Sequence, residues 1–378
     1  MRTRALAPVL LLPVLALTGC GSLVESTEPA SGSGAPADGT VAVTATDEAC
    51  EVARTDLPNG LTTFAITNGG SQVTEVYVYA GERIVTEKED IGPGTSYELT
   101  VDLTAGDYEV ACKPGMVGDG IRQAISVTGE GSPLEPAEQE AVDGYRAFVQ
   151  ERADATVPLV QQLRDAVAAG DRAGAQALYA PSRVPWETIE PVAESFGDLD
   201  PRMDAREADL LEGEEFTGWH RLEKALWTGE DLAPVVPVAD QLLLDVTELA
   251  QRVPNAALTP TSIGNGAKEL LDEVATGKIT GEEEAFSHTD LVDFQANVDG
   301  ARAALDALRP LVEVADPELL ASLDAEFAAV QGALEPYRSG DGFVSYDTVG
   351  EDGRRDLARA VDGLSEPLSR LGAAAGGA

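Results

Sequence analysis

The chain has 378 residues, of which 43% are hydrophobic, so it is long enough for two domains and apolar enough to bury real cores. Its formal net charge is −40, from 66 acidic and 26 basic residues. A chain this acidic lacks the lysine and arginine clusters that bind phosphate, which excludes nucleic acid and anionic membrane surfaces as partners. The charge is compatible with attracting cations, although acids scattered along a whole chain also serve solubility alone.

Residues 1–19 are typical of a lipoprotein signal peptide. Arg2 and Arg4 precede an apolar run of 15 residues, which is too short for an ordinary membrane span. The run leads into Leu-Thr-Gly-Cys, which resembles a bacterial lipobox, so we expect cleavage before Cys20 and a lipid on its sulfur. A secretory signal without lipid is the alternative. The expected location is the outer face of the cell membrane, with the N-terminal lipid as the only membrane attachment.

Residues 20–40 are rich in Gly, Ser, Ala and Pro, the composition of a flexible tether. Cys50 and Cys112 are the two remaining cysteines once Cys20 is assigned to lipid. In an exported protein such a pair is most simply one disulfide. A pair of metal ligands is the alternative.

Residues 41–130 are predicted to form a small β-sandwich. Short runs rich in β-branched and aromatic residues alternate with Gly, Pro and Asn, and in TEVYVYA the residues Val76 and Val78 fall on one face. Met116 follows Cys112 by four residues, as at the Cys and Met end of a copper loop. Both histidines of the chain lie beyond residue 219, so a blue-copper site, which needs two of them, is excluded.

Residues 133–378 are predicted to be helical, because apolar residues recur there with helical spacing and Pro and Gly fall mostly between the segments. Helices are expected near 136–153, 157–170, 205–228, 239–253, 264–276, 300–315, 317–335 and 354–371. A region of this length favours two stacked bundles over one. The predicted fold class is therefore multidomain, a small β-sandwich followed by an all-α domain.

Residues 215–227, EFTGWHRLEKALW, carry one of only two histidines in the chain. A helix over 205–228 would place His220 and Glu223 at i and i+3 on one face, where a metal ion can bridge them. Lys224 stands where the zinc-peptidase motif His-x-x-Glu-His needs its second histidine, and an ammonium is no ligand, so the pattern disfavours a peptidase. Spacing alone also fits an ordinary buried helix pair.

Acids in the preceding segment, 184–210, repeat this spacing. Glu187 and Glu190 lie three residues apart, and so do Asp204 and Glu207. The pattern is typical of carboxylate-rich iron sites in helical bundles, where such pairs point inward. Burying several acids together without a cation is costly, so these side chains either bind a cation or face water.

The second histidine, His288, lies in Ser-His-Thr-Asp. Ser287 or Thr289 can cap a helix that starts here, with acids in its first turn. Contact of His288 with a metal or its ligands is the alternative. All three tryptophans flank the acidic motifs and are expected to pack in the core: Trp186, Trp219 and Trp227.

Three long motifs carry a family resemblance, in the order WETIEPVAESFGDLDPRMDAREAD, EFTGWHRLEKALW and ITGEEEAFSHTDLVDFQANVDGA. They resemble the EfeO family of bacterial iron-uptake proteins, and the resemblance covers nearly the whole chain after residue 19. It implies a cupredoxin-like domain over 41–130 and an imelysin-like helical domain of two four-helix bundles over 133–378.

The resemblance implies an extracytoplasmic component of a ferrous/ferric iron importer. Such systems include a ferric permease in the membrane and a haem peroxidase of the dye-decolourising type. The family's His-x-x-Glu motif maps onto His220 and Glu223, and its acidic partners map onto Glu187, Glu190 and Asp204. Carboxylate and imidazole donors suit iron, while zinc fits the same donors and copper is a further alternative.

In the strand domain the resemblance suggests a modified metal site built from Cys50 and Cys112 with Glu75, near Met116. A disulfide would consume both thiolates, so this metal site and the disulfide exclude each other. The expected function is iron binding without enzymatic activity. Ferroxidase activity, metallopeptidase activity and a purely structural surface lipoprotein are the alternatives.

Overall fold

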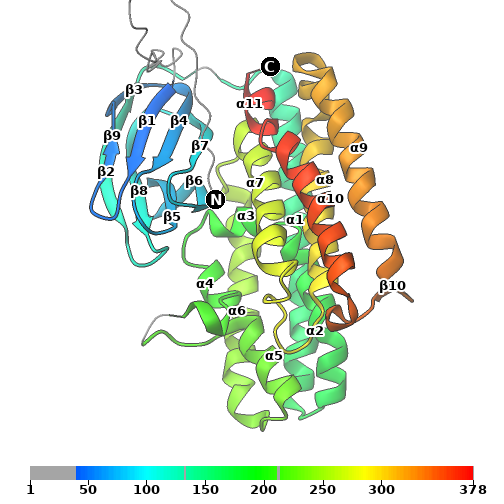
Figure 1. Ribbon diagram of the computed structural model, residues 1–378. Coiled ribbons are helices and arrows are strands. Elements are labelled where there is room, and N and C mark those ends of the chain that lie inside the picture. Colours follow the sequence, from blue (N-terminus) through cyan, green and yellow to red (C-terminus); the bar gives the residue numbers. More distant parts are fainter. Residues whose placement is uncertain (1–39, 132, 211–212, 378) are drawn as a thin grey trace, which may run out of the picture. The chain divides into compact units, whose positions relative to one another are not determined.

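The computed structural model describes residues 40–131, 133–210 and 213–377, which lie in one compact unit (Figure 1). The expected signal peptide, the lipidation site Cys20 and all of the tether except residue 40 lie outside these residues. In this described part of the chain, every helix is too short or too polar to cross a bilayer.

Short strands make up the first part of the described chain (Figure 1). They are β1 (Thr40–Ala45), β2 (Cys50–Val52), β3 (Asp56–Pro58), β4 (Gly60–Asn68), β5 (Thr74–Ala80), β6 (Arg83–Ile91), β7 (Ser96–Leu103), β8 (Gly106–Pro114) and β9 (Ile121–Thr128). One sheet has the order β2-β1-β4-β7 and the other β3-β9-β8-β5-β6. Strand β1 runs parallel to β4 and β3 parallel to β9, while the other neighbours are antiparallel.

The predicted β-sandwich is confirmed, and its core follows from side-chain alternation. Val76 and Val78 of β5 are buried in the core between the sheets, while Tyr77 and Tyr79 pack with Ala111 on the opposite face. Strands β1 and β9 also belong to the sandwich, and every second residue of β1 is buried from Val41 to Ala45.

Helices make up the rest of the described chain. The longer ones are α1 (Pro136–Ala168), α2 (Arg172–Glu187), α5 (Gly218–Thr228), α6 (Val236–Arg252), α7 (Pro260–Glu273), α8 (Asp290–Ala315), α9 (Pro317–Leu334) and α10 (Glu351–Leu368). Shorter pieces are α3 (Glu190–Glu194), α4 (Asp200–Met203), η1 (Glu207–Asp209), η2 (Ala233–Val235), η3 (Val253–Asn255), η4 (Val274–Lys278), η5 (Glu335–Tyr337), η6 (Tyr346–Thr348) and α11 (Leu371–Gly376). Two-residue strands β10 (Arg338–Ser339) and β11 (Gly342–Phe343) pair in a small hairpin.

The longer helices pack as two groups of four. Helices α1, α2, α5 and α6 contact one another in one group, and α7, α8, α9 and α10 do so in the other. Helix α8 also packs against α1 and α2, so a single apolar core runs through both groups. The predicted pair of bundles is therefore two helix groups around one continuous core.

The helix prediction omitted α2 (Arg172–Glu187), and it was also wrong over much of 205–228. Only Gly218–Thr228 is α-helical there, and the described residues before it include the single 3-10 turn η1. Gly213 and Gly218 have φ angles of 102° and 71°, which an α-helix does not allow. Asp204 and His220 therefore lie on separate elements, which allows the chain to bring them face to face.

The sandwich and the helices are linked by polar contacts. Lys88 of β6 forms an ion pair of 2.8 Å with Asp272 of α7. Asn265 of α7 donates from Nδ2 to the backbone oxygen of Thr100 in β7 at 2.8 Å. Helix α7 is thus the element of the helical part that meets the strands in these contacts.

Candidate metal centre

His220 and Glu223 lie on the buried face of α5. Their side chains are 2% and 1% exposed, and His220 Nδ1 is 3.5 Å from Glu223 Oε2. The prediction that they share one helix face is confirmed. Glu223 Oε1 accepts the backbone N–H groups of Phe286 at 2.8 Å and Ser287 at 2.6 Å, which ties the loop before α8 to this helix.

Asp204 and Glu283 bring carboxylate oxygens to the other nitrogen of the His220 ring. His220 Nε2 lies 3.3 Å from Asp204 Oδ1 and 3.5 Å from Glu283 Oε1. Trp186 holds Asp204 in place by donating from Nε1 to Oδ2 at 2.8 Å. Ligand atoms of Asp204, His220 and Glu283 all lie within 4.8 Å of one another, a spacing that one metal ion can bridge.

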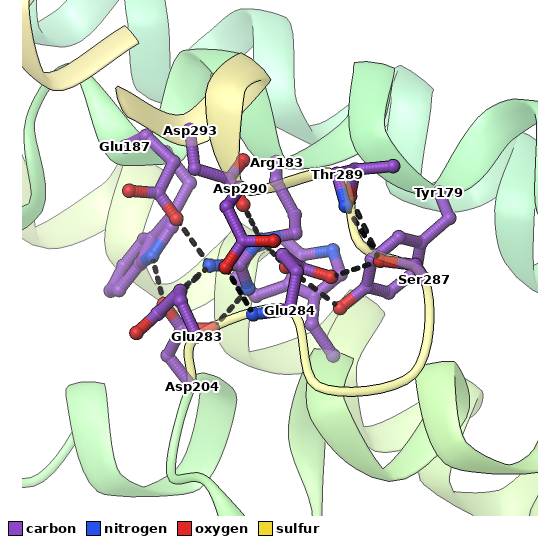
Figure 2. A network of polar contacts seen from close by, with 12 residues as sticks. Tyr179, Arg183, Glu187, Asp204, Glu283, Glu284, Ser287, Thr289, Asp290 and Asp293 are labelled. Carbon is purple, nitrogen blue, oxygen red and sulfur yellow. Dashed lines mark hydrogen bonds and ion pairs between the residues drawn. The ribbon is translucent and has the colours of Figure 1, made fainter. Parts of the chain in front are cut away.

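A fully buried arginine, Arg183 of α2, lies among these acids (Figure 2). Its Nη atoms donate to Asp204 and Glu187. Its Nε lies 2.9 Å from Glu284 Oε1 and 3.3 Å from Asp293 Oδ2. Arg183 is therefore the internal counter-charge of the centre, since buried carboxylates need a paired cation.

The loop before α8 and the first turn of α8 supply further acids, and Figure 2 shows them gathered around Arg183. Glu284 is fully buried and accepts hydrogen bonds from the Tyr179 hydroxyl at 3.2 Å and from Ser287 Oγ at 2.6 Å. Asp290 accepts the backbone N–H of Glu284 at 3.2 Å. A second triad of His220, Glu223 and Glu284 also has ligand atoms within 4.8 Å of one another.

Glu187 and Glu190 lie beside the centre rather than around His220. The helix breaks between them, because α2 ends at Glu187 and α3 begins at Glu190. Lys278, also fully buried, places its Nζ 3.1 Å from Glu187 Oε2 and 3.8 Å from Glu190 Oε2. Of the three acids predicted as partners, only Asp204 is in contact with His220 among the described ion pairs.

The charges of the centre are finely balanced. Burial and the charge of Arg183 lower the pKa of His220, but the neighbouring carboxylates outweigh both and raise it to about 10. Burial raises the pKa of Glu284 to about 8, although Arg183 opposes this. Burial also disfavours ionised Asp204, but Arg183 and His220 hold its pKa below the ordinary value. At neutral pH, His220 is an imidazolium and Glu284 keeps its proton, and a metal ion would displace both protons.

Several buried polar atoms of the centre lack a hydrogen bond. Both ring nitrogens of His220 and Oε2 of Glu223 belong to this set. Their mutual contacts of 3.3 to 3.5 Å are ion pairs without hydrogen-bond geometry. Unsatisfied buried polar atoms are costly and rare in folded proteins. Donor atoms that face one another without bonding fit an ion between them better than a purely structural network.

Thr289 occupies one of the two predicted N-cap positions beside His288, but the capping hydrogen bond is absent. Helix α8 begins at Asp290 after Thr289, whose side chain makes no capping hydrogen bond. His288 adopts a φ of 57°, and its backbone oxygen accepts from Tyr346 N at 2.9 Å. The metal alternative for His288 has no support among the described contacts either.

The tryptophans pack as expected, and Lys224 lies outside the centre. Trp186 and Trp219 are fully buried, with ring centroids 5.5 Å apart. Trp227 packs against Tyr179 at 5.4 Å. Lys224 pairs with Glu207 near the surface, so Glu207 is not a partner of Asp204 in the centre.

Cys50 and Cys112 form a disulfide that joins β2 of one sheet to β8 of the other. Neither sulfur is then a thiolate ligand, which removes the metal alternative for this pair. Glu75 neighbours Val76 on β5 and so points to the opposite face of the sheet, where Lys113 Nζ lies 3.5 Å from its Oε2. Met116 is 38% exposed in the turn after β8. The structure does not bring these four residues together.

Sequence reasoning missed Arg183, Lys278, Glu283 and Glu284. Glu283 and Glu284 stand in the motif quoted for the family resemblance, within a run of three glutamates that resembles a solvated loop. Arg183 and Lys278 carried no signal of burial, because long basic side chains usually reach water.

Comparison with known proteins gives two family matches. The model of the imelysin family matches residues 141–371, and the cupredoxin-like domain model matches residues 14–125. A solved structure from Parabacteroides distasonis is also similar, with a TM-score of 0.47 and 16% identity over 65% of this chain and 95% of that chain.

Curated relatives match over most of the chain. The iron uptake system component EfeO of Escherichia coli O1:K1 is 40% identical over 88% of this chain and 90% of that protein. The proteins of the same name from E. coli K12 and Shigella flexneri are each 39% identical over the same shares. The chain therefore belongs to the EfeO family, with a cupredoxin-like β-sandwich followed by an imelysin domain.

Proposed function

We propose that this chain is the iron-binding component of an iron uptake system. Its relatives are named as components of such a system, which supports an iron uptake role. The observation that carries the proposal is the buried pair of His220 and Glu223. Both ring nitrogens of His220 and Oε2 of Glu223 lie near the carboxylates of Asp204, Glu283 and Glu284 without hydrogen bonds. Hard Fe³⁺ prefers such carboxylate oxygens, and imidazole also suits iron.

When a metal ion binds at this centre, its positive charge replaces that of a proton held by the buried side chains. The ion takes the place of the His220 proton, and the carboxylates of Asp204 and Glu283 remain ionised beside it. Arg183 stays paired with Glu187 on the far side of Asp204. The centre thus exchanges protons for a metal ion without leaving a buried charge unpaired.

In the proposed role the protein captures iron outside the membrane and delivers it to a ferric permease. The lipobox at Cys20 and the tether would keep it at the outer face of the cell membrane, near that permease and a haem-containing peroxidase of the dye-decolourising type. Reversible binding suits delivery, and proton exchange at His220 provides a means of release.

We propose binding rather than catalysis. A peptidase of the related motif needs a second histidine, and Lys224 stands at that position and pairs with Glu207. A copper ferroxidase would need ligands in the sandwich, where there is no histidine and the two cysteines form a disulfide. Zinc at the His220 centre is the second candidate ligand by donor type.

The two histidines give a matched test. His220→Asn and His288→Asn make the same change inside and outside the proposed site, and Glu223→Gln removes one charge at constant shape. We expect Fe³⁺ to bind more than about 100-fold more weakly to His220→Asn and Glu223→Gln, with little change in His288→Asn. Titration with Fe³⁺ citrate, followed by calorimetry, measures this. Equal affinity in all four proteins would falsify the proposed centre.

A further inference from the structure

A second buried carboxylate group lies next to the His220 centre, and it is organised around Glu190. This residue begins α3 and is 6% exposed. Its Oε2 has no hydrogen-bond partner, and the Lys278 ammonium is 3.8 Å away. A buried carboxylate oxygen without a hydrogen-bond donor is costly, and the long ion pair with Lys278 compensates its charge only weakly.

Glu190 faces a carboxylate group on each of two sides. Ligand atoms of Glu190, Glu187 and Glu273 lie within 4.8 Å of one another, and so do those of Glu190, Asp200 and Asp204. The first group already holds a cation, because Lys278 Nζ is 3.1 Å from both Glu187 Oε2 and Glu273 Oε2.

The second group has no such cation of its own. No described ion pair or hydrogen bond reaches the Asp200 side chain, which begins α4 and is partly buried. The carboxylate of Asp204 is shared with Arg183 and His220 on its other side. In the space bounded by Glu190, Asp200 and Asp204, the Asp200 side chain has no described partner and Glu190 has only the long ion pair with Lys278.

We propose that Glu190, Asp200 and Asp204 form a second cation site, which shares Asp204 with the His220 centre and takes a hard, oxygen-seeking cation. That this cation is Fe³⁺ rests on the proposed function, whereas the site itself rests on the orphaned Glu190 oxygen and the unpaired Asp200. Asp204 is then a carboxylate that links two neighbouring ions, as in dinuclear carboxylate sites of helical bundles.

The two sites differ in their donors and therefore in selectivity. The His220 centre offers a nitrogen together with oxygens, which suits Zn²⁺ as well as iron. The Glu190 site offers only carboxylate oxygens, which favour hard cations over Zn²⁺. Fe³⁺ should fill both sites, and Zn²⁺ should fill only the His220 centre.

The position of the Glu190 site also indicates a role. Glu273, which neighbours Glu190, lines a pocket together with Glu194, Glu269 and Asp272. Neighbouring groups share a residue: Glu190 belongs to the group of Glu273 and to that of Asp204, and Asp204 also belongs to the group of His220. Carboxylates therefore follow one another from the pocket to the His220 centre. The Glu190 site is thus an intermediate station at which an ion exchanges one set of carboxylates for the next.

Isosteric substitutions test the site directly. Asp200→Asn and Glu190→Gln remove one ligand charge each, and Glu207→Gln, an exposed acid nearby, is the control. The full chain is loaded with Fe³⁺ nitrilotriacetate or with Zn²⁺, excess metal is removed, and bound metal is counted by mass spectrometry. We expect about two Fe³⁺ per chain in the wild type and control and about one in both variants, with about one Zn²⁺ in all four proteins.

The metal-free proteins give a second readout. Because Asp200 lacks a partner, Asp200→Asn should raise the melting temperature of the metal-free chain while lowering its iron content. Equal iron in wild type, Asp200→Asn and Glu190→Gln, all folded by circular dichroism, would overturn the inference, and so would loss of all iron in both variants.

The double variant His220→Asn/Glu223→Gln separates this inference from the proposed function. This variant should lose the ion bound at the His220 centre and keep the ion that depends on Asp200. If it binds as much iron as the wild type while Asp200→Asn binds less, the His220 centre fails and the Glu190 site stands.

Discussion

Arg183 is the buried counter-charge of the proposed metal centre. Its guanidinium is fully buried and contacts Glu187, Asp204 and Glu284, with Asp293 3.3 Å from Nε. Removing one partner of a buried ion network leaves uncompensated charge, which typically costs about 3–5 kcal/mol. We therefore expect Arg183→Met to lower the free energy of unfolding of the metal-free protein by about this amount.

Added Fe³⁺ should recover part of that loss, because the ion supplies the missing positive charge. Arg355→Met, an exposed arginine on α10, is the control and should change stability by less than about 0.5 kcal/mol. Urea denaturation with and without Fe³⁺ measures both. An Arg183→Met protein as stable as the control would contradict the role of Arg183 as counter-charge.

Glu269 of α7 makes stability depend on pH. Burial, with the charges of Asp272 and Glu273, raises its pKa to about 8. The folded protein therefore holds this proton more tightly than the unfolded chain, so the contribution of Glu269 is favourable at low pH and is lost as the pH rises through about 8. Glu269→Gln should have little effect at pH 5 and stabilise the protein at pH 9 by about 1–2 kcal/mol, a value reduced because Glu269 is partly exposed.

Denaturation curves at the two pH values test this, with the exposed Glu366→Gln on α10 as the control. A Glu269→Gln variant that gains no stability over Glu366→Gln at pH 9 would contradict the assignment.

At the residue scale, the sequence predicted some acidic residues of the proposed centre but none of its buried basic residues. The i, i+3 spacing correctly predicted that His220 and Glu223 share a face, because both lie within one regular helix. The same rule failed for Glu187 and Glu190, because the helix ends between them. Lys278 and Arg183 could not be predicted, since only the assembled fold shows which basic side chain is surrounded by acids.

At the scale of elements, Gly218 sets the distance between α4 and α5. It begins α5 with a φ of 71°, and a Cβ at this position would lie 2.0 Å from the backbone oxygen of Met203. Any larger residue therefore pushes His220 away from Asp204. We expect Gly218→Ala to cost about 3 kcal/mol or more and to weaken iron binding.

Gly144 in α1 is the matched control, because a Cβ there meets nothing within 4 Å. Gly144→Ala should stabilise the protein by about 0.5–1 kcal/mol through helix propensity and leave iron binding unchanged. Urea denaturation measures the stability of both variants, and titration measures their iron binding. Equal stability and equal iron binding of the two variants would contradict the close approach of α5 to Met203.

The elements themselves were predicted unevenly. Long periodic segments such as α6 and α9 were found near their true bounds, because packing on one side enforces the helical period. The segment 205–228 was predicted as one helix, since propensity cannot see that Gly213 and Gly218 break it. That break places Asp204 and His220 on separate elements, so the proposed centre could not be derived from a single continuous helix.

At the scale of the whole molecule, the disulfide fastens the two sheets of the sandwich together. Cys50 and Cys112 are 62 residues apart, and a cross-link over such a loop contributes about 4 kcal/mol through the entropy of the unfolded chain. Neither cysteine should react with iodoacetamide in denatured, unreduced protein. The double variant Cys50→Ser/Cys112→Ser should be less stable by about 2–4 kcal/mol. Labelling of both cysteines before reduction would contradict the disulfide.

The composition of the whole chain predicted only general properties. The charge of −40 indicated a cation-attracting or simply soluble protein, and nothing in it marked which acids are buried. The resemblance of three motifs, more than any single residue, led to the family and to both domains. The arrangement of acids around Arg183 and Lys278 followed only from the fold.

The most direct test of the proposed centre is to locate the metal. Crystals of the full chain loaded with Fe³⁺ are measured at the iron absorption edge, where anomalous differences reveal iron alone. We predict a peak beside a ring nitrogen of His220, within one of its two triads, that of Asp204 and Glu283 or that of Glu223 and Glu284. Iron-loaded crystals that show ordered His220 and Glu223 side chains and no anomalous peak beside them would contradict it.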